Sequence, residues 1–188
     1  MQGYSELPPD LPVPTDDGAC DHLLGADLPD LTLISTEGPP VNLRDDAEGI
    51  LVLYLYPRTA RPGEALPPGW DSIPGARGCT PQSCSFRDHA GRFTELRATV
   101  MGVSSQTTDE QRDFARRMHI PFALLSDPDL RLATELQLPT FEAGGMRLFK
   151  RVTLVAERTT IVKVFYPVYS PDRNAEEVID WLSARPRR

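Results

Sequence analysis

The sequence lacks the hydrophobic segments that would place the chain in or across a membrane. No apolar run approaches the roughly 20 residues that a membrane-spanning helix needs. Residues 1–20 contain neither the basic stretch nor the apolar stretch of a secretory signal. We therefore expect no membrane partner and no secretory targeting.

Basic residues are in deficit. The 20 Lys and Arg residues are outnumbered by 27 Asp and Glu residues, which gives a net charge of −7 and a pI near 5.0. A protein that binds nucleic acid needs a basic face to neutralise phosphates, and an anionic membrane surface attracts the same residues. The charge balance therefore argues against nucleic acid and against an anionic lipid surface as partners.

Cysteine is scarce too, with only Cys20, Cys79 and Cys84 in the chain. Three cysteines, an odd number, do not build a disulfide framework. In a reducing compartment a close pair is more often catalytic or metal-binding than structural. The sequence therefore predicts a cytoplasmic protein in which Cys79 and Cys84 carry chemistry, and it assigns no role to Cys20.

What the chain does contain is enough apolar sequence for one domain with a full core, since 40% of its 188 residues are hydrophobic. The apolar run at 50–56 predicts a strand buried on both faces. Strands that alternate with helices, followed by a hairpin and a last helix, predict an α/β fold with a mixed central sheet covered on both faces. The other expected elements are a hairpin at 31–34 and 41–43, a helix from Cys79 through Phe86, Ala90, Phe93 and Leu96, a strand at 99–104, a helix to about 119 capped by Thr107 or Thr108, a strand at 122–125, a helix at 127–137, a loop at 139–145, strands at 148–156 and 161–166, and a final helix capped by Asp172 or Asn174.

Two segments stand outside this pattern. Residues 1–28 begin polar and proline-rich, which predicts an N-terminal extension that packs little or adds onto an edge of a domain spanning 29–188. Residues 58–78 form a Pro/Gly-rich loop, and loops of this length are more often functional than idle. We expect Trp70, in the middle of the loop, to anchor it by packing rather than to serve as a lid.

The run Gly-Cys-Thr-Pro-Gln-Ser-Cys-Ser-Phe-Arg-Asp at 78–88 places Cys79 at a helix start and Cys84 five residues later. A thiolate at a helix N-terminus is stabilised by unpaired N–H groups and by the positive end of the helix dipole. A peroxide oxidises such a thiolate to a sulfenic acid, which a second thiol converts to a disulfide. The pair therefore predicts reduction of hydroperoxides, with Cys79 as the attacking residue and Cys84 as the resolving one.

Regular helix geometry sets a condition on this chemistry. Two residues five apart on one helix have Cα atoms about 8.6 Å apart, whereas a disulfide needs roughly 4.4–6.8 Å. A Cys79–Cys84 disulfide therefore requires the first turn of the helix to unwind.

Two simpler interpretations of the pair remain: ordinary buried cysteines, or metal ligands together with His89. Gly78 before the pair and Pro81 within it favour a functional helix start over ordinary buried cysteines. The C-x4-C-x4-H spacing matches no usual zinc pattern. We therefore expect no metal and no cofactor.

Several short segments, each weak alone, follow one another in a specific order. They are Asp-Leu-Pro-Asp-Leu-Thr-Leu at 27–33, Tyr56-Pro57, Gly78-Cys79 with Cys84, Phe86-Arg87-Asp88, Leu-Leu-Ser-Asp-Pro at 124–128, Arg-Val-Thr-Leu-Val at 151–155 and Asn-Ala-Glu-Glu-Val at 174–178. Together they resemble the peroxiredoxins, specifically the bacterioferritin-comigratory (PrxQ-like) subfamily, over roughly residues 25–184.

The resemblance implies a thioredoxin-like fold with an N-terminal hairpin. It also implies that Cys79 is the peroxidatic cysteine, that Cys84 resolves it, and that Arg151 supports the thiolate. The implied substrates are hydrogen peroxide and organic hydroperoxides, and the implied reductant is thioredoxin or a similar dithiol protein. We expect a monomer or a weak dimer.

The chain departs from the family in one motif, P-x-x-x-(T/S)-x-x-C. Counting from Pro57 puts Arg61 at the Thr position and Glu64 at the Cys position, so an insertion at 58–78 splits the motif. Thr80, Thr59 or a backbone N–H is a candidate to replace the missing hydroxyl. Three arginines flank the site, and we expect most of them to be solvated: Arg58, Arg61 and Arg77.

Two rival functions stay open at this point. A thiol–disulfide oxidoreductase would share the fold, although such proteins usually use C-x-x-C, which this chain lacks. A non-enzymatic redox sensor or binding module on a degenerate peroxiredoxin scaffold would account for the split motif.

Overall fold

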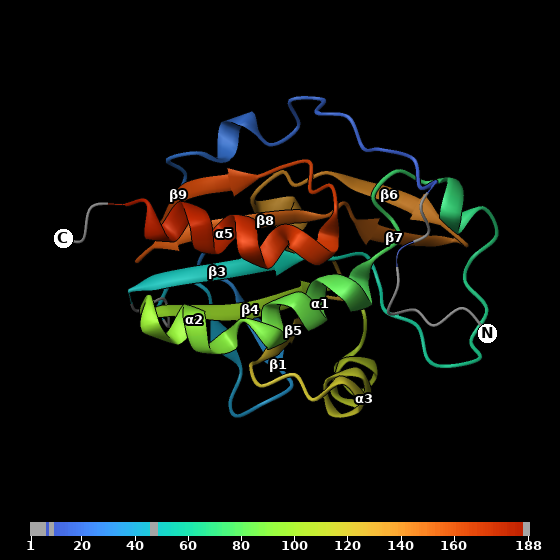
Figure 1. Cartoon of the computed structure of the whole chain (residues 1–188), viewed down its shortest axis with the longest axis horizontal. Coiled ribbons are helices and arrows are strands. Elements are labelled where there is room, and N and C mark those ends of the chain that lie inside the picture. The colour runs from blue at the N-terminus through green and yellow to red at the C-terminus, as the bar shows by residue number, and fades with distance from the viewer. Residues whose placement is uncertain (1–6, 8–9, 46–48, 186–188) are drawn as a thin grey trace.

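The computed structural model of the chain describes residues 7, 10–45 and 49–185. Its central sheet is mixed, with strand order β2-β1-β5-β4-β3-β8-β9 (Figure 1). The β3–β4 and β4–β5 pairs are parallel and the other neighbours are antiparallel. The strands are β1 (Thr32–Ser35), β2 (Val41–Asn42), β3 (Ile50–Leu55), β4 (Ala98–Ser104), β5 (Leu124–Ser126), β8 (Val152–Glu157) and β9 (Thr160–Phe165). The predicted α/β class, the N-terminal hairpin and the buried strand at 50–56 are confirmed.

The two faces of β3 carry the two halves of the core, because successive side chains of a strand point to opposite faces. Leu53 and Leu55 pack into one cluster with the N-terminal segment and α4, while Val52 and Tyr54 pack into the other with α1, α2, α3 and α5. Figure 1 shows α1, α2 and α5 side by side in front of the sheet. The helices are α1 (Cys79–Asp88), α2 (Ala90–Glu95), α3 (Thr108–Met118), α4 (Arg131–Glu135) and α5 (Asn174–Ser183), with short 3-10 turns η1 (Asp21–Leu23), η2 (Trp70–Ser72) and η3 (Pro171–Arg173).

The expected loop at 139–145 is wrong, and the expected strand at 148–156 is confirmed except that it is interrupted at Lys150 and Arg151. A separate two-stranded sheet, β6 (Thr140–Ala143) and β7 (Met146–Phe149), occupies this region. Gly144 and Gly145, which join the two strands, both have positive φ, the conformation that a two-residue hairpin turn requires. The chain then leaves this hairpin at Lys150 and Arg151 and enters the central sheet as β8.

The helix expected from Cys79 through Leu96 is broken once. His89 has φ −101 and ψ 7, so α1 ends before it and α2 begins after it. The apolar stripe continues across the break because Phe86 and Phe93 are buried in the same cluster and stack at 5.5 Å between ring centroids. The periodicity of the apolar residues predicts the continuous buried face of the two helices but not the kink between them.

Helix starts were predicted with mixed success. The expected cap of α3 is confirmed as Thr107, which forms a reciprocal capping box with Glu110. The expected cap of α5 is wrong, because Arg173 precedes this helix and no side chain caps it. Asn174 lies inside the first turn, and its side chain makes buried contacts with α1 and β8 instead.

The N-terminal segment is part of the packed structure. Residues 1–6 and 8–9 of the predicted extension lie outside the described residues. Residues 25–28 run along β9 (Figure 1), where Gly25 N–H donates to the Ile161 carbonyl and Ile161 N–H donates to the Ala26 carbonyl, both at 2.8 Å. Leu23 and Leu28 are wholly buried. Of the two expectations for this segment, it therefore adds onto the sheet edge rather than packing little.

The Pro/Gly-rich loop at 58–78 is held down by Trp70. This side chain is 3% exposed and packs against the β6–β7 hairpin, with its ring 6.0 Å from that of Phe141. The expected anchoring role of Trp70 is confirmed. None of the helices in the described part of the chain is long and apolar enough to cross a bilayer.

The parallel strands leave no space for a side chain at Gly102 of β4. A Cβ atom there would lie 2.6 Å from the Tyr54 ring and 2.7 Å from Leu124. We expect Gly102→Ala to lower the free energy of unfolding by about 1–3 kcal/mol, because overpacking forces side chains off their rotamers. Denaturant unfolding measures this. Gly91→Ala in α2 is the matched control: its Cβ meets open space, so helix propensity should raise stability by about 0.5–1 kcal/mol. Equal effects of the two substitutions would contradict the packing described for β4.

Candidate active site

Cys79 lies at the first position of α1, and its side chain is 4% exposed. The preceding Gly78 has φ 100, a left-handed conformation that glycine adopts without a steric penalty. Gly78 also lies close to Pro171, since a Cβ on it would be 2.3 Å from the Pro171 ring. Glycine is therefore needed twice over at this point, for the backbone conformation and for the approach of η3. The result is a sulfur at the positive end of a ten-residue helix.

Arg151 approaches this sulfur from the loop that precedes β8. Its Nη2 atom donates to Cys79 Sγ at 3.2 Å and to the Arg77 carbonyl at 3.0 Å. Its Nη1 atom donates to the Gln82 side-chain oxygen. Arg151 is 3% exposed, so its charge is buried among neutral acceptors apart from the sulfur. A buried charge is costly without a counter-charge, and among the groups that accept hydrogen bonds from Arg151 the Cys79 sulfur is the one whose chemistry allows a negative charge.

Cys84 is half-buried on the same helix, and all three cysteines are free. Burial raises the pKa of the Cys84 thiol, and the nearby Arg87 guanidinium opposes this only in part. The helix is regular from Cys79 to Asp88, so the Cα atoms of the two cysteines are about 8.6 Å apart. The structure thus places the predicted pair on one helix, in an arrangement that cannot form a disulfide without unwinding.

The space in front of Cys79 is small. A cavity of about 20 Å³ is lined by Cys79, Thr59, Thr80 and other residues of the loop at 58–78. This is room for about one water molecule. Thr59 is fixed at the cavity by Gln106, whose side-chain oxygen accepts from the Thr59 N–H at 2.7 Å and from its hydroxyl at 3.0 Å. Both threonines that the sequence offered as replacements for the missing hydroxyl therefore line the cavity.

The flanking arginines are less solvated than expected. Arg61 is exposed, but Arg58 and Arg77 both line the cavity. Arg58 pairs with Glu64 at 2.8 Å, and Arg77 pairs with Asp71 at 3.2 Å. The loop thus surrounds the cavity with positive charge that carboxylates partly offset.

A buried polar chain behind the site was missed by sequence reasoning. Gln82 donates to Asn174 at 3.0 Å and Thr153 donates to the same Asn174 oxygen at 2.7 Å. These three residues are 0% exposed. The spacing of Gln82, three residues after Cys79, was a usable signal because residues three apart share a helix face. Nothing local to Asn174 distinguishes it from a helix cap.

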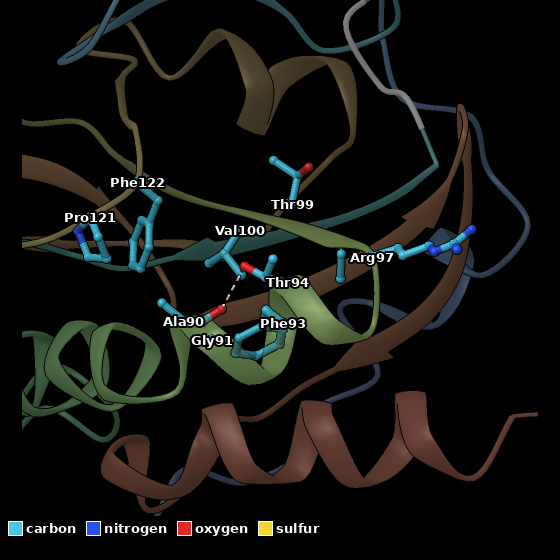
Figure 2. A pocket seen from close by; sticks show the side chains of 10 residues that line it. Ala90, Gly91, Phe93, Thr94, Arg97, Thr99, Val100, Pro121 and Phe122 are labelled. Atoms are coloured by element: carbon cyan, nitrogen blue, oxygen red, sulfur yellow. Dashed lines mark hydrogen bonds between the residues drawn. The ribbon is translucent and has the colours of Figure 1, made fainter.

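A larger groove of about 530 Å³ lies elsewhere, between α2, β4 and residues 121–122 (Figure 2). Its lining is mostly apolar, from Phe93, Val100 and Phe122, and the Thr94 hydroxyl already donates to the Ala90 carbonyl. It contains no cysteine. The size of a cavity therefore does not identify the candidate active site in this fold. Within residues 7, 10–45 and 49–185, no three His, Cys, Asp or Glu side chains gather closely enough to hold a metal ion.

Comparison with known proteins identifies the family of the chain. The profile of the AhpC/TSA family matches residues 72–164. Chloroplastic peroxiredoxin Q of Sedum lineare is 29% identical over 161 residues, which are 85% of this chain and 77% of that protein. Peroxiredoxin Bcp of Bacillus subtilis is 29% identical over 157 residues, or 81% and 90% of the two chains. The chain is a Q/Bcp-like peroxiredoxin.

Solved structures agree with this assignment. The crystal structure of peroxidoxin BcpB from Mycobacterium tuberculosis superposes with a TM-score of 0.69 at 26% identity, covering 87% of this chain and 98% of that one. Peroxiredoxin Q of Xanthomonas campestris, at 21% identity and a TM-score of 0.66, covers 93% and 98% and supports the fold. This peroxiredoxin is therefore a thioredoxin-like enzyme of the thiol-dependent peroxidase class, which acts on a peroxide with a thiol reductant. The sensor and the oxidoreductase hypotheses are set aside.

Cys20 and Cys84 of this peroxiredoxin should differ in reactivity. Cys20 is 5% exposed, and burial, with the nearby Asp17, Asp16 and Asp21, raises its pKa to about 12. Because only the thiolate reacts, we expect iodoacetamide at pH 8 to modify Cys20 about 10-fold or more slowly than the half-buried Cys84. Mass mapping of a time course measures the two rates. In urea the rates should converge, and faster labelling of Cys20 in the folded protein would contradict the burial described here.

Proposed function

We propose that this peroxiredoxin reduces hydrogen peroxide and organic hydroperoxides through Cys79, with Cys84 as the resolving residue and Arg151 as the supporting cation. The observation that carries the proposal is the 3.2 Å contact between the Arg151 guanidinium and Cys79 Sγ at the start of α1. It combines a buried positive charge and a helix N-terminus at one sulfur, and both favour the thiolate that attacks peroxides.

In the first step the Cys79 thiolate attacks the distal oxygen of the hydroperoxide. An S–O bond forms, the O–O bond breaks, and the leaving oxygen takes a proton to become water or an alcohol. The Arg151 fork is placed to bind the oxygens as charge develops on them. A cavity of about 20 Å³ at the sulfur suits the O–O end of the substrate. We infer that the organic part of a larger hydroperoxide stays outside it.

In the second step the Cys84 sulfur attacks the Cys79 sulfenic acid. An S–S bond forms and water leaves, which requires the first turn of α1 to unwind because a disulfide needs shorter Cα separations. Unwinding would also expose Cys84 to water. Since burial is the main cause of its raised pKa, exposure would lower that pKa and make its thiolate easier to form.

The cycle closes when thioredoxin or a similar dithiol protein reduces the disulfide, so that two electrons pass from the dithiol to Cys79 and Cys84. Such dithiols are kept reduced in the cytoplasm, which is the location that we propose. We also propose that the N-terminal residues to about 28 are an extension of a domain spanning 29–188, with the insertion at 58–78 walling the active-site cavity. A monomer or weak dimer suffices for this cycle because both cysteines are on one helix.

Substitution of the three proposed residues should separate the two steps. We expect Cys79→Ser to abolish peroxide consumption, and Arg151→Met to slow the first step about 10²–10³-fold because a charged donor to the developing negative charge is lost. Cys84→Ser should retain the first step but accumulate sulfenic and sulfinic acid. Stopped-flow oxidation of the reduced protein with mass mapping of the products tests all three. Peroxide turnover by Cys79→Ser would overturn the assignment.

A matched pair of variants can show which threonine replaces the hydroxyl that the split motif lacks. We infer that Thr59 replaces it, because Gln106 fixes both the N–H and the hydroxyl of Thr59 beside the cavity, whereas Thr80 lies within α1 and moves with it. Thr59→Val should slow the first step about 10- to 100-fold, and Thr80→Val should change it by less than about 3-fold. Stopped-flow rates at low peroxide measure this, and the reverse ranking would assign the role to Thr80.

A further inference from the structure

Asn174 carries an arrangement that the peroxidase reaction described above does not use. It is the first residue of α5 and is 0% exposed. Its side-chain oxygen accepts two hydrogen bonds, from Gln82 Nε2 at 3.0 Å and from the Thr153 hydroxyl at 2.7 Å. Its own NH2 group is buried and hydrogen-bonds to nothing among the described residues. This buried amide therefore makes its contacts through its oxygen, which accepts both hydrogen bonds.

The Asn174 oxygen also decides which way the Gln82 amide faces. Because Gln82 directs its NH2 group to Asn174, its oxygen is directed to Arg151, which donates to it. A flipped Gln82 would place an oxygen against the Asn174 oxygen and an NH2 group against the guanidinium, and neither contact is a hydrogen bond. Hydrogen bonds thus link Thr153, Asn174, Gln82, Arg151 and Cys79 in one chain.

The same segment of η3 and α5 contacts the first turn of α1 at a second point. Pro171 lies against Gly78 so closely that no Cβ fits between them. Gln82 is in the first turn and a half of α1, between the two cysteines. Unwinding this part of the helix would withdraw Gln82 from Asn174 and from Arg151, and would leave buried donors and acceptors without partners.

We propose that Asn174 is a positioning residue that sets how often the first turn of α1 unwinds, and thereby how the Cys79 sulfenic acid is partitioned. Two reactions compete for that acid. In one, the Cys84 thiol attacks it, an S–S bond forms and water leaves. In the other, a second hydroperoxide oxidises it to the sulfinic acid while its own O–O bond breaks and an alcohol or water is released. Disulfide formation needs the unwound turn, whereas oxidation to the sulfinic acid does not. The inference rests on the proposed roles of Cys79 and Cys84.

The test compares Asn174→Ala with Asn174→Asp. Alanine removes the acceptor oxygen, whereas aspartate keeps an oxygen toward both donors and puts a second oxygen, with a charge when it is ionised, in place of the NH2 group that has no partner. A typical net hydrogen-bond contribution shifts an equilibrium about 5- to 10-fold. We therefore expect Asn174→Ala to form the Cys79–Cys84 disulfide about 5- to 10-fold faster and to yield a correspondingly smaller sulfinic fraction at high peroxide. Asn174→Asp should restore a disulfide rate and a sulfinic fraction close to wild type.

The readouts are the rate of disulfide formation after a single peroxide pulse and the disulfide-to-sulfinic ratio by mass mapping. An unchanged ratio in folded Asn174→Ala overturns the proposal, as does an Asn174→Asp variant that behaves like alanine. A second variant keeps the test open if Asn174→Ala does not fold. Gln82→Met removes the same hydrogen bond from the α1 side, and it should raise the disulfide rate in the same direction.

Hydrogen exchange of the reduced protein separates this proposal from the proposed function. In Asn174→Ala, amides at 79–84 should exchange about 5- to 10-fold faster than in wild type, while those of β3 and β4 stay unchanged. This measurement needs no peroxide. Faster exchange at 79–84 without any disulfide in wild type would leave the positioning role standing and remove the resolving role of Cys84. Unchanged exchange at 79–84 would remove the positioning role alone.

Discussion

The contact between a buried guanidinium and a cysteine sulfur is the interaction on which the rest of this site depends. Arg151 is almost fully buried, and its acceptors are backbone carbonyls, the Gln82 amide and Cys79 Sγ. A desolvated cation gains most from an anion, and Cys79 Sγ is the contact of Arg151 whose chemistry allows a negative charge. The strand that begins after Arg151, the left-handed Gly78 and the start of α1 all serve to bring these two groups together.

In the cycle that we propose, the same packing that favours a reactive sulfur opposes the next step. A folded α1 keeps Cys79 at the helix N-terminus beside Arg151, yet it holds Cys84 too far away for a disulfide. The two requirements cannot be met by one conformation. On our proposal the stability of one helical turn, with its contacts between Pro171 and Gly78 and between Asn174 and Gln82, becomes a kinetic property of the enzyme. The proposal thereby gives η3 and α5, which are remote from Cys79 in sequence, an influence on the fate of its oxidised sulfur.

The sequence pattern predicts an element or a residue's role correctly where the local pattern and the burial of the side chains agree. It does not where the two differ. The buried strand β3 and the α3 capping box follow from residue type and periodicity along the chain. The anchoring role of Trp70 follows from its residue type within a long loop, although its packing partners lie in the β6–β7 hairpin. The sequence pattern does not predict the β6–β7 hairpin, because its strands are short and its Gly-Gly turn suits a loop equally well. The residue type of Asn174 suits a helix cap, although its hydrogen-bond partners lie on other elements.

By itself, the sequence determined that two cysteines lie five residues apart at a helix start, that the fold alternates strands and helices, and that the family motif is split by an insertion. These are statements about neighbours along the chain, for which residue type and spacing are sufficient. Only the tertiary structure decided that Arg151 reaches Cys79, that Thr59 lies at the cavity beside Gln106, and that Asn174 braces Gln82. Each of these contacts joins residues from 47 to 92 positions apart. Their geometry is set by sheet register and helix packing, which no local pattern encodes.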